Sequence, residues 1–263
     1  MRRLENKVAI ITGGAGGIGK AAGKLFVEEG AHVILVDLQE QGLQDAVRSI
    51  GDENVSYVVA DTTQPDQVQR FVNEAVQRHG GVDILIANAG IEGEINSIIE
   101  TPVEMFDKVM SVNVRGVWLG LKYVMPLMRE RGGGSIVITS STAGVRGSAG
   151  MSPYSTSKHA VIGLMRSAPM EGASMGIRVN TVNPAPIQTR MMRSIEEQWV
   201  SGGREGFSTV EEARETVAGG NPLRRYGEPE EVGRLMMFLA SDESSYCNGG
   251  VYMVDGGNTA GRT

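Results

Sequence analysis

The chain has 263 residues, enough for one α/β domain with a full hydrophobic core. Its 25 Lys and Arg and 31 Asp and Glu give a net charge of -6 with both signs interspersed, so we expect no nucleic-acid partner. The 36 glycines gather in short loops without a regular period, which excludes collagen-like and low-complexity classes.

Cys247 is the single cysteine of the sequence, which rules out an intramolecular disulfide and fits a reducing compartment. The first apolar run, residues 8–11, is too short for a signal-peptide core or a membrane span. We therefore expect a cytoplasmic protein without a membrane partner.

Residues 8–11 are continuously apolar, as in a parallel strand buried on both faces. A glycine-rich loop, residues 12–19, and a helical pattern as far as Glu29 follow. This order is typical of a phosphate-binding loop, in which glycines allow close backbone approach and the helix N-terminus offers free N–H groups to a pyrophosphate. Two spacings fit and the sequence does not separate them: Gly14, Gly16, Gly19 and Gly13, Gly17, Gly19.

Asp37 ends the next predicted strand, residues 33–36, and is placed to accept hydrogen bonds from an adenosine ribose while repelling a 2′-phosphate. No Lys or Arg lies inside the glycine loop. Charge complementarity therefore favours NAD over NADP.

The same alternation continues, with predicted helices 40–50 and 65–79 and strands 55–60 and 84–87, and it indicates right-handed βαβ units and a parallel sheet. Asp61 and the run Asn88, Ala89, Gly90 follow two of these strands, at the edge where open α/β sheets bind ligands.

The second half of the chain supplies further polar residues. A helical stretch, 113–131, begins at Asn113, and strand 135–139 delivers Ser141 to the same edge. Strand 177–182 is followed by a weakly patterned stretch, part of residues 185–225, which we interpret as a substrate lid. Helix 229–240 and strand 251–254 complete the chain.

Tyr154 and Lys158 lie four residues apart in a predicted helix that begins near Pro153, so their side chains share one face. A neighbouring ammonium lowers the pKa of a phenol, which makes Tyr154 a candidate general acid/base. An exposed pair with the ring packed along the lysine stem is the alternative. Ser141 precedes Tyr154 closely enough for both side chains to reach a common point.

These motifs, taken together and in this order, resemble those of the short-chain dehydrogenase/reductase family. The resemblance covers nearly the whole chain and is to the single-domain branch of about 250 residues. The resemblance implies a doubly wound, seven-stranded parallel sheet, a Rossmann fold, as one NAD-binding domain over residues 1–263 with a helical lid at 185–225. It also implies hydride transfer between NAD(H) and a secondary alcohol or ketone.

The same resemblance implies roles for individual residues. Tyr154 is the acid/base, Lys158 lowers its pKa and holds the nicotinamide ribose, Ser141 binds the reacting oxygen, and Asn113 anchors a water in a proton relay. No metal is implied. The residues expected at the cofactor are Gly13, Gly17, Ile18, Gly19, Asp37, Asp61, Asn88, Ala89, Gly90, Tyr154, Lys158, Pro184, Ile187 and Thr189.

Two other functions fit parts of this pattern. An NAD-dependent epimerase or dehydratase uses the same Tyr-Lys pair, but chain length argues against it. A non-catalytic dinucleotide sensor is disfavoured because all four polar positions are present. The resemblance also suggests a homotetramer formed through residues 113–131 and 154–175. The sequence leaves open whether the substrate is a cyclic or aromatic alcohol, a polyol or a steroid.

Two residues depart from the family pattern. Ala185 follows Pro184 where the family has glycine, and cofactor binding should survive if Ala185 keeps a negative φ. Pro169 lies inside the helix that carries Tyr154, where a proline removes a backbone hydrogen bond and clashes with the carbonyl of Met165. We expect that helix to kink or end early between Met165 and Pro169.

Overall fold

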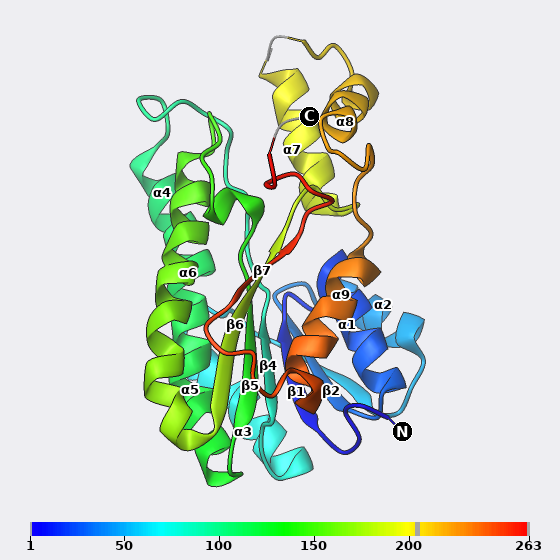
Figure 1. Ribbon diagram of the computed structural model, residues 1–263, viewed down its shortest axis with the longest axis vertical. Helices are drawn as coiled ribbons and strands as arrows, with labels where there is room; N and C mark the ends of the chain where they lie inside the picture. Colours follow the sequence, from blue (N-terminus) through cyan, green and yellow to red (C-terminus); the bar gives the residue numbers. More distant parts are fainter. Residues whose placement is uncertain (1, 203–205, 262–263) are drawn as a thin grey trace.

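The computed structural model describes residues 2–202 and 206–261. The apolar runs form a parallel sheet of seven strands in these described residues, in the order β3-β2-β1-β4-β5-β6-β7 (Figure 1). The inner strands are buried on both faces, as continuous apolar runs require, and the edge strands less so. The strands are β1 (Val8–Thr12), β2 (His32–Asp37), β3 (Val55–Val59), β4 (Ile84–Ala87), β5 (Gly134–Thr139), β6 (Ile177–Pro184) and β7 (Val251–Val254).

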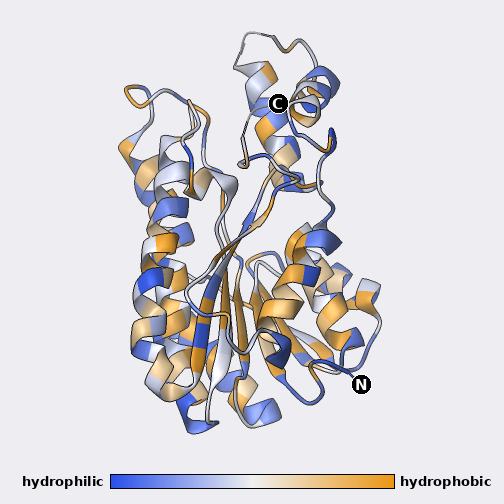
Figure 2. Cartoon of the chain, in the orientation of Figure 1, coloured by the Kyte–Doolittle hydropathy of each residue, from blue (hydrophilic) through white to orange (hydrophobic). Residues whose placement is uncertain are grey.

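Helices cover both faces of the sheet, each burying its apolar side (Figure 2). One layer contains α1 (Gly17–Glu28), α2 (Glu40–Ile50) and α9 (Pro229–Ala240). The other contains α3 (Pro65–His79), α5 (Gly116–Glu130) and α6 (Ser152–Gly172), with α4 (Val103–Met110) beyond them. The predicted doubly wound fold is confirmed.

Because every strand pair is parallel, the carboxyl ends of the strands meet at one edge. The β1–α1, β4–α4 and β5–α6 connections, which carry the predicted site residues, all leave the sheet there. The order reverses at β1, whose neighbours are β2 and β4, and such a switch point leaves a crevice for a ligand.

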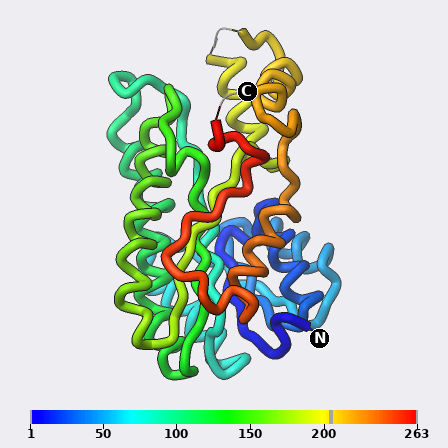
Figure 3. The backbone as a smooth tube through the Cα atoms, in the orientation of Figure 1, coloured from blue at the N-terminus to red at the C-terminus, as the bar shows by residue number. Residues whose placement is uncertain are grey.

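The predicted lid contains two helices, α7 (Arg190–Ser201) and α8 (Val210–Gly219), which stand above the sheet edge at the top of Figure 1. Thr189 and Thr209 cap their N-termini through side-chain oxygens. Positions 203–205 of the lid prediction lie outside the described residues. The C-terminal segment, red in Figure 3, runs from β7 to the lid, where Asn221 Nδ2 donates to Asp255 O at 3.0 Å.

The expected early end of the Tyr154 helix is wrong. α6 continues past Pro169 to Gly172, and a 3₁₀ turn, Ala173–Met175, follows. Pro169 lies in the last turn of the helix, where it lacks the N–H that would donate to Met165 O, and its ring is buried close to Gly249. Burial of the ring therefore offsets part of the backbone cost.

The predicted helix beginning at Asn113 also differs in detail. α4 runs without a break into a π-helical turn, Ser111–Arg115, and then into α5. Single π turns within helices occur most often at functional sites. Here the turn carries Asn113.

Candidate active site

A cavity of about 710 Å³ lies between the carboxyl edge of the sheet and the lid. Its walls include nearly every residue that the sequence predicted for the site. Gly19 and Asn113 are the two exceptions among them, and both lie behind the wall. Residues spread from position 13 to position 217 thus converge on one space.

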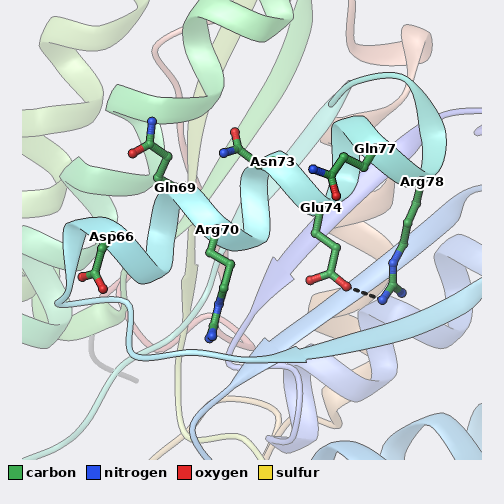
Figure 4. A pocket seen from close by; sticks show the side chains of 7 residues that line it. All are labelled: Asp66, Gln69, Arg70, Asn73, Glu74, Gln77 and Arg78. Atoms are coloured by element: carbon green, nitrogen blue, oxygen red, sulfur yellow. Dashed lines mark hydrogen bonds and ion pairs between the residues drawn. The ribbon is translucent and has the colours of Figure 1, made fainter.

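A second hollow, of about 440 Å³, lies along α3 and is shown in Figure 4. Its lining side chains are polar or charged and come from one helix, with Glu74 paired to Arg78. None of the predicted site residues lines it, so the larger cavity is the candidate active site.

The backbone of the glycine loop reaches the cavity floor, and three of the loop glycines leave no room for a side chain. Gly13 has φ +68°, and a Cβ there would lie 2.9 Å from Asn88 Nδ2. A Cβ at Gly19 would lie 2.2 Å from Gly13 O. A Cβ at Gly14 would also lie too close to a neighbour, 2.7 Å from Leu35 Cβ, so these contacts do not separate the two glycine spacings. α1 begins at Gly17 with its free N–H groups at the cavity.

Asp37 and Asp61 mark one end of the cavity. Asp37 Oδ2 accepts from Ala15 N at 3.2 Å, which joins the end of β2 to the glycine loop. Asp61 Oδ1 accepts from Thr63 N at 2.8 Å. Arg190, which the sequence analysis did not identify, also lines this end, and its Nη1 lies 3.5 Å from Gln39 Oε1.

A polar network crosses the floor from the glycine loop to Lys158. Thr12 Oγ1 accepts from the backbone N–H groups of Asn88 and Ala89 at 3.0 and 3.1 Å. The Asn88 side chain donates to Thr12 O at 3.1 Å and accepts from Thr139 Oγ1 at 3.1 Å. Lys158 Nζ donates to Thr139 O at 2.9 Å. The carboxyl ends of β1, β4 and β5 are therefore held in one relative position.

Asn113 is 1% exposed and is held by both its oxygen and its nitrogen. Its Oδ1 accepts from Ile91 N at 2.8 Å, and its Nδ2 donates to Ile91 O at 2.9 Å and to Ser157 Oγ at 3.0 Å. Ser157 Oγ in turn donates to Tyr154 O at 2.7 Å. A Cβ on Gly90 would lie 3.2 Å from Asn113 Oδ1 and 3.5 Å from Lys158 Nζ, so Gly90 lies beside both groups.

Tyr154 and Lys158 share a face of α6, and Lys158 Nζ lies 5.5 Å from the centre of the tyrosine ring. Burial raises the pKa of Tyr154 to about 12; the hydrogen bond with Ser141 partly offsets this, and the charge of Glu92 adds to it. Burial also lowers the pKa of Lys158 to about 8. The net shift of the Tyr154 pKa is therefore upward, because burial disfavours the charged phenolate, and the lowering of this pKa by Lys158 stays a prediction.

Ser141 ends the β5 edge and caps a short turn, since its Oγ accepts from Ala143 N at 3.1 Å. Asn183 Nδ2 donates to Ser141 O at 3.0 Å. On the next strand, Ala185 does not take a positive φ, so the condition set for this departure from the family pattern is met. Ile187 and Thr189 then lead the chain into α7 along the cavity wall.

Five residues that hold the site or the lid in place were not among the site residues predicted from the sequence. Thr12, Thr139 and Ser157 are of types that commonly cap strands and turns, so only their partners reveal their part here. Glu196 and Tyr226 form a buried pair in the lid, with Tyr226 Oη donating to Glu196 Oε1 at 2.7 Å. Burial, together with the Glu196 carboxylate, raises the pKa of Tyr226 above its ordinary value.

In residues 2–202 and 206–261 we find neither a helix that could cross a bilayer nor a cluster of three or more His, Cys, Asp or Glu side chains suited to a metal ion.

The sequence of this chain is similar to those of known oxidoreductases over nearly its whole length. A family model described as "Enoyl-(Acyl carrier protein) reductase" matches residues 13–259. Levodione reductase of Leifsonia aquatica is 37% identical, over 98% of this chain and 96% of that protein. The 3-oxoacyl-[acyl-carrier-protein] reductase FabG of Thermotoga maritima is 40% identical, over 97% and 98%.

Solved structures agree with the sequence relatives. The crystal structure of levodione reductase superposes with a TM-score of 0.93, covering 98% of this chain and 99% of that one at 37% identity. The crystal structure of NAD+-bound xylitol dehydrogenase gives a TM-score of 0.90, covering 96% and 98% at 33% identity.

Proposed function

The chain belongs to the short-chain dehydrogenase/reductase family, and on this premise we propose that it transfers a hydride between NAD(H) and a secondary alcohol or ketone, with Tyr154 as the general acid/base. The observation that carries the proposal is the convergence of Ser141, Tyr154 and Lys158 on one cavity, beside a glycine loop that admits no side chain at its closest points.

The residues present suit a nicotinamide dinucleotide. The loop from Gly13 to Gly19 and the first turn of α1 would hold the pyrophosphate, and Asp37 would accept hydrogen bonds from the adenosine ribose. Lys158 would reach the nicotinamide ribose. When bound, the cofactor supplies or accepts the hydride.

Reduction of a ketone builds negative charge on its oxygen, and donors aimed at that oxygen stabilise the transition state more than the ground state. The hydroxyls of Ser141 and Tyr154 are such donors. Because its pKa is raised to about 12, Tyr154 is protonated at neutral pH, which is the form that a general acid needs. Asn113 keeps Ile91 and the Tyr154 turn of α6 in place behind Lys158.

Tyr154→Phe tests the proposal. It removes the proton donor and leaves the ring, so we expect kcat to fall by about 10² to 10⁴ while the Kd for NADH, followed by its fluorescence, changes little. Tyr246→Phe is the matched control, since Tyr246 is fully exposed and does not line the cavity. A Tyr154→Phe variant as active as the parent would remove Tyr154 from the mechanism.

The preference for NAD rests on Asp37, and the NAD+-bound xylitol dehydrogenase supports it by similarity. Arg190 is a cation at the same end of the cavity, so its contribution to cofactor preference has to be measured separately from that of Asp37. We expect kcat/KM to be higher with NADH than with NADPH, Asp37→Ala to narrow the difference, and Arg190→Ala to weaken any activity with NADPH. Equal kcat/KM for both cofactors in the parent enzyme would overturn the role of Asp37.

A homotetramer formed through α5 and α6 is part of the proposal. Trp118 on α5 is 47% exposed and Met170 on α6 is 82% exposed, which supports these helices as an interface. Light scattering of the purified protein checks the mass, and Trp118→Glu should shift it toward dimers or monomers.

A further inference from the structure

The two halves of the cavity have different chemistry. The sheet half consists of the glycine loop and the strand ends, with Asp37, Asp61 and Lys158. The lid half consists of α7, α8 and the stretch before α6, and its walls are apolar: Met151, Met192, Ile195 and Trp199 are each less than a tenth exposed, and Met191 and Val217 adjoin them. Tyr154 packs against this same apolar cluster. The reacting hydroxyl therefore lies between the two halves.

Few charged side chains line the cavity outside the sheet half. On the lid, Arg190 lines the end of the cavity near Asp37, and Glu196 is buried against Tyr226 outside the lining. Glu92 does not line the cavity either, although its charge acts on Tyr154.

Among the described residues that line the cavity, Arg146 is the charged side chain at the substrate end, and it is exposed at the outer rim. Its Nη1 lies 3.4 Å from Asn258 O of the C-terminal segment. Ser148, also exposed, is the neighbouring polar residue at this rim. The walls next to Tyr154 thus offer a substrate few polar partners besides Tyr154 and Ser141.

We infer that the substrate is a compact apolar ketone, or the matching secondary alcohol, held between the lid methionines and Trp199. This inference rests on the proposed function. Methionine side chains are flexible and polarisable, so the lid half can close on apolar substrates of several shapes. The substrate is compact because the same cavity of about 710 Å³ also has to hold the dinucleotide.

Hydrogen bonding separates this class from polyols. Each hydroxyl of a bound polyol, apart from the one that reacts, would lose water and face methionine, isoleucine or tryptophan. A buried hydroxyl without a partner weakens binding by about ten- to a hundredfold. Two or three such groups outweigh what the remaining carbon atoms gain, so a polyol is a poor substrate. A charged group close to the reacting carbon would be disfavoured more strongly.

A substrate panel with NADH tests the inference. The probes are a methyl-substituted cyclohexanone, the polyol ketone xylulose and the β-keto thioester acetoacetyl-CoA. We expect kcat/KM for the cyclohexanone to exceed that for each of the others by at least about a hundredfold. A higher kcat/KM for xylulose or for the thioester overturns the inference and leaves the proposed function in place. Absence of turnover with every carbonyl probe overturns the proposed function, and the inference with it.

Met192→Gln tests whether the apolar lid is responsible for the preference for an apolar ketone. It keeps the length of the side chain and puts an amide in the apolar wall, so we expect KM for the cyclohexanone to rise about tenfold with a smaller change in kcat. Leu223→Gln is the control, an exposed apolar residue of the lid segment that does not line the cavity. Unchanged NADH binding in both variants verifies the fold. An unchanged KM in Met192→Gln would show that the lid does not select the substrate.

Discussion

The sheet half and the lid half of the cavity are held together in opposite ways. In the sheet half, polar groups satisfy one another across β1, β4 and β5 through Thr12, Asn88 and Thr139. In the lid half, apolar side chains pack around the buried pair Glu196 and Tyr226. A hydrogen-bonded network loses stability when its donors and acceptors move out of line, whereas an apolar cluster accepts many substitutions of one apolar side chain by another.

This difference separates two tasks. The half that would bind a constant partner, the cofactor, is built from backbone and from polar side chains that hydrogen-bond to one another. The half that would bind the substrate is built from side chains that can be exchanged without disturbing the first. Substitutions in the glycine loop of the sheet half should therefore weaken cofactor binding, and substitutions in the lid should alter stability or KM.

The largest effect is expected for Gly19→Ala in the sheet half. The new Cβ would meet Gly13 O at 2.2 Å, so the glycine loop has to move away from α1. We expect the Kd for NADH to rise more than about a hundredfold, measured by fluorescence titration.

The matched change in the lid is Gly219→Ala, at the end of α8, where nothing lies within 4 Å of the added Cβ. It should leave the Kd unchanged and stabilise the protein by at most about 1 kcal/mol. Equal Kd values for NADH in both variants would contradict the contrast between the halves.

Tyr226→Phe tests the lid. It leaves the Glu196 carboxylate buried without this hydroxyl donor, so the free energy of unfolding should fall by about 2 to 3 kcal/mol and Tm by about 4 to 10 °C. Adding Glu196→Leu should restore part of the loss, because the uncompensated charge is gone. NADH affinity is expected to stay within about twofold in both variants. A large loss of cofactor binding would show that the halves are coupled.

Lys158→Met should abolish activity and stabilise the protein at pH 7 by about 1 to 2 kcal/mol. The gain in stability comes from removing a buried cation, and the lost hydrogen bond to Thr139 O offsets part of it. The pKa of Lys158 is about 8 when folded and 10.5 when unfolded. Below pH 8 both states are protonated and the parent bears the full burial cost.

Between pH 8 and 10.5 the unfolded chain binds more protons, so the stability of the parent rises with pH. Above pH 10 Tyr154 acts in the opposite sense, since its pKa is raised from 10.0 to about 12. Urea unfolding at pH 7 and 9.5 should therefore show a rise in the parent that is absent from the variant. A variant less stable than its parent at pH 7 would contradict the assignment of this cost to Lys158.

The smallest effect on stability is expected for Pro169→Ala, because Pro169 belongs to neither half of the cavity. The variant regains the backbone N–H, but it loses a ring buried close to Gly249. We expect a net change below about 1 kcal/mol, or a few degrees in Tm by calorimetry. A gain of 3 kcal/mol or more would restore the sequence-based view of a strained helix.

The sequence determined the fold and the place of the site. Hydrophobic period and glycine or proline boundaries act over a few residues, so the bounds of α2, α3, α9 and β4 match their predicted ranges. Alternating strands and helices then require a parallel sheet, and its carboxyl edge gathers Asp61, Asn88 and Ser141. The spacing of Tyr154 and Lys158 placed both on one helix face.

Only the tertiary structure decided how these groups are held and how they titrate. Asn88 and Thr12 are 76 positions apart, and Glu196 and Tyr226 are 30 apart, so no local pattern pairs them. Burial raises the pKa of Tyr154 and lowers that of Lys158, although their spacing alone suggested the reverse for Tyr154. The cost of Pro169 likewise depends on what surrounds its ring. Periodicity is a property of neighbours in sequence, whereas desolvation and hydrogen-bond pairing depend on neighbours in space.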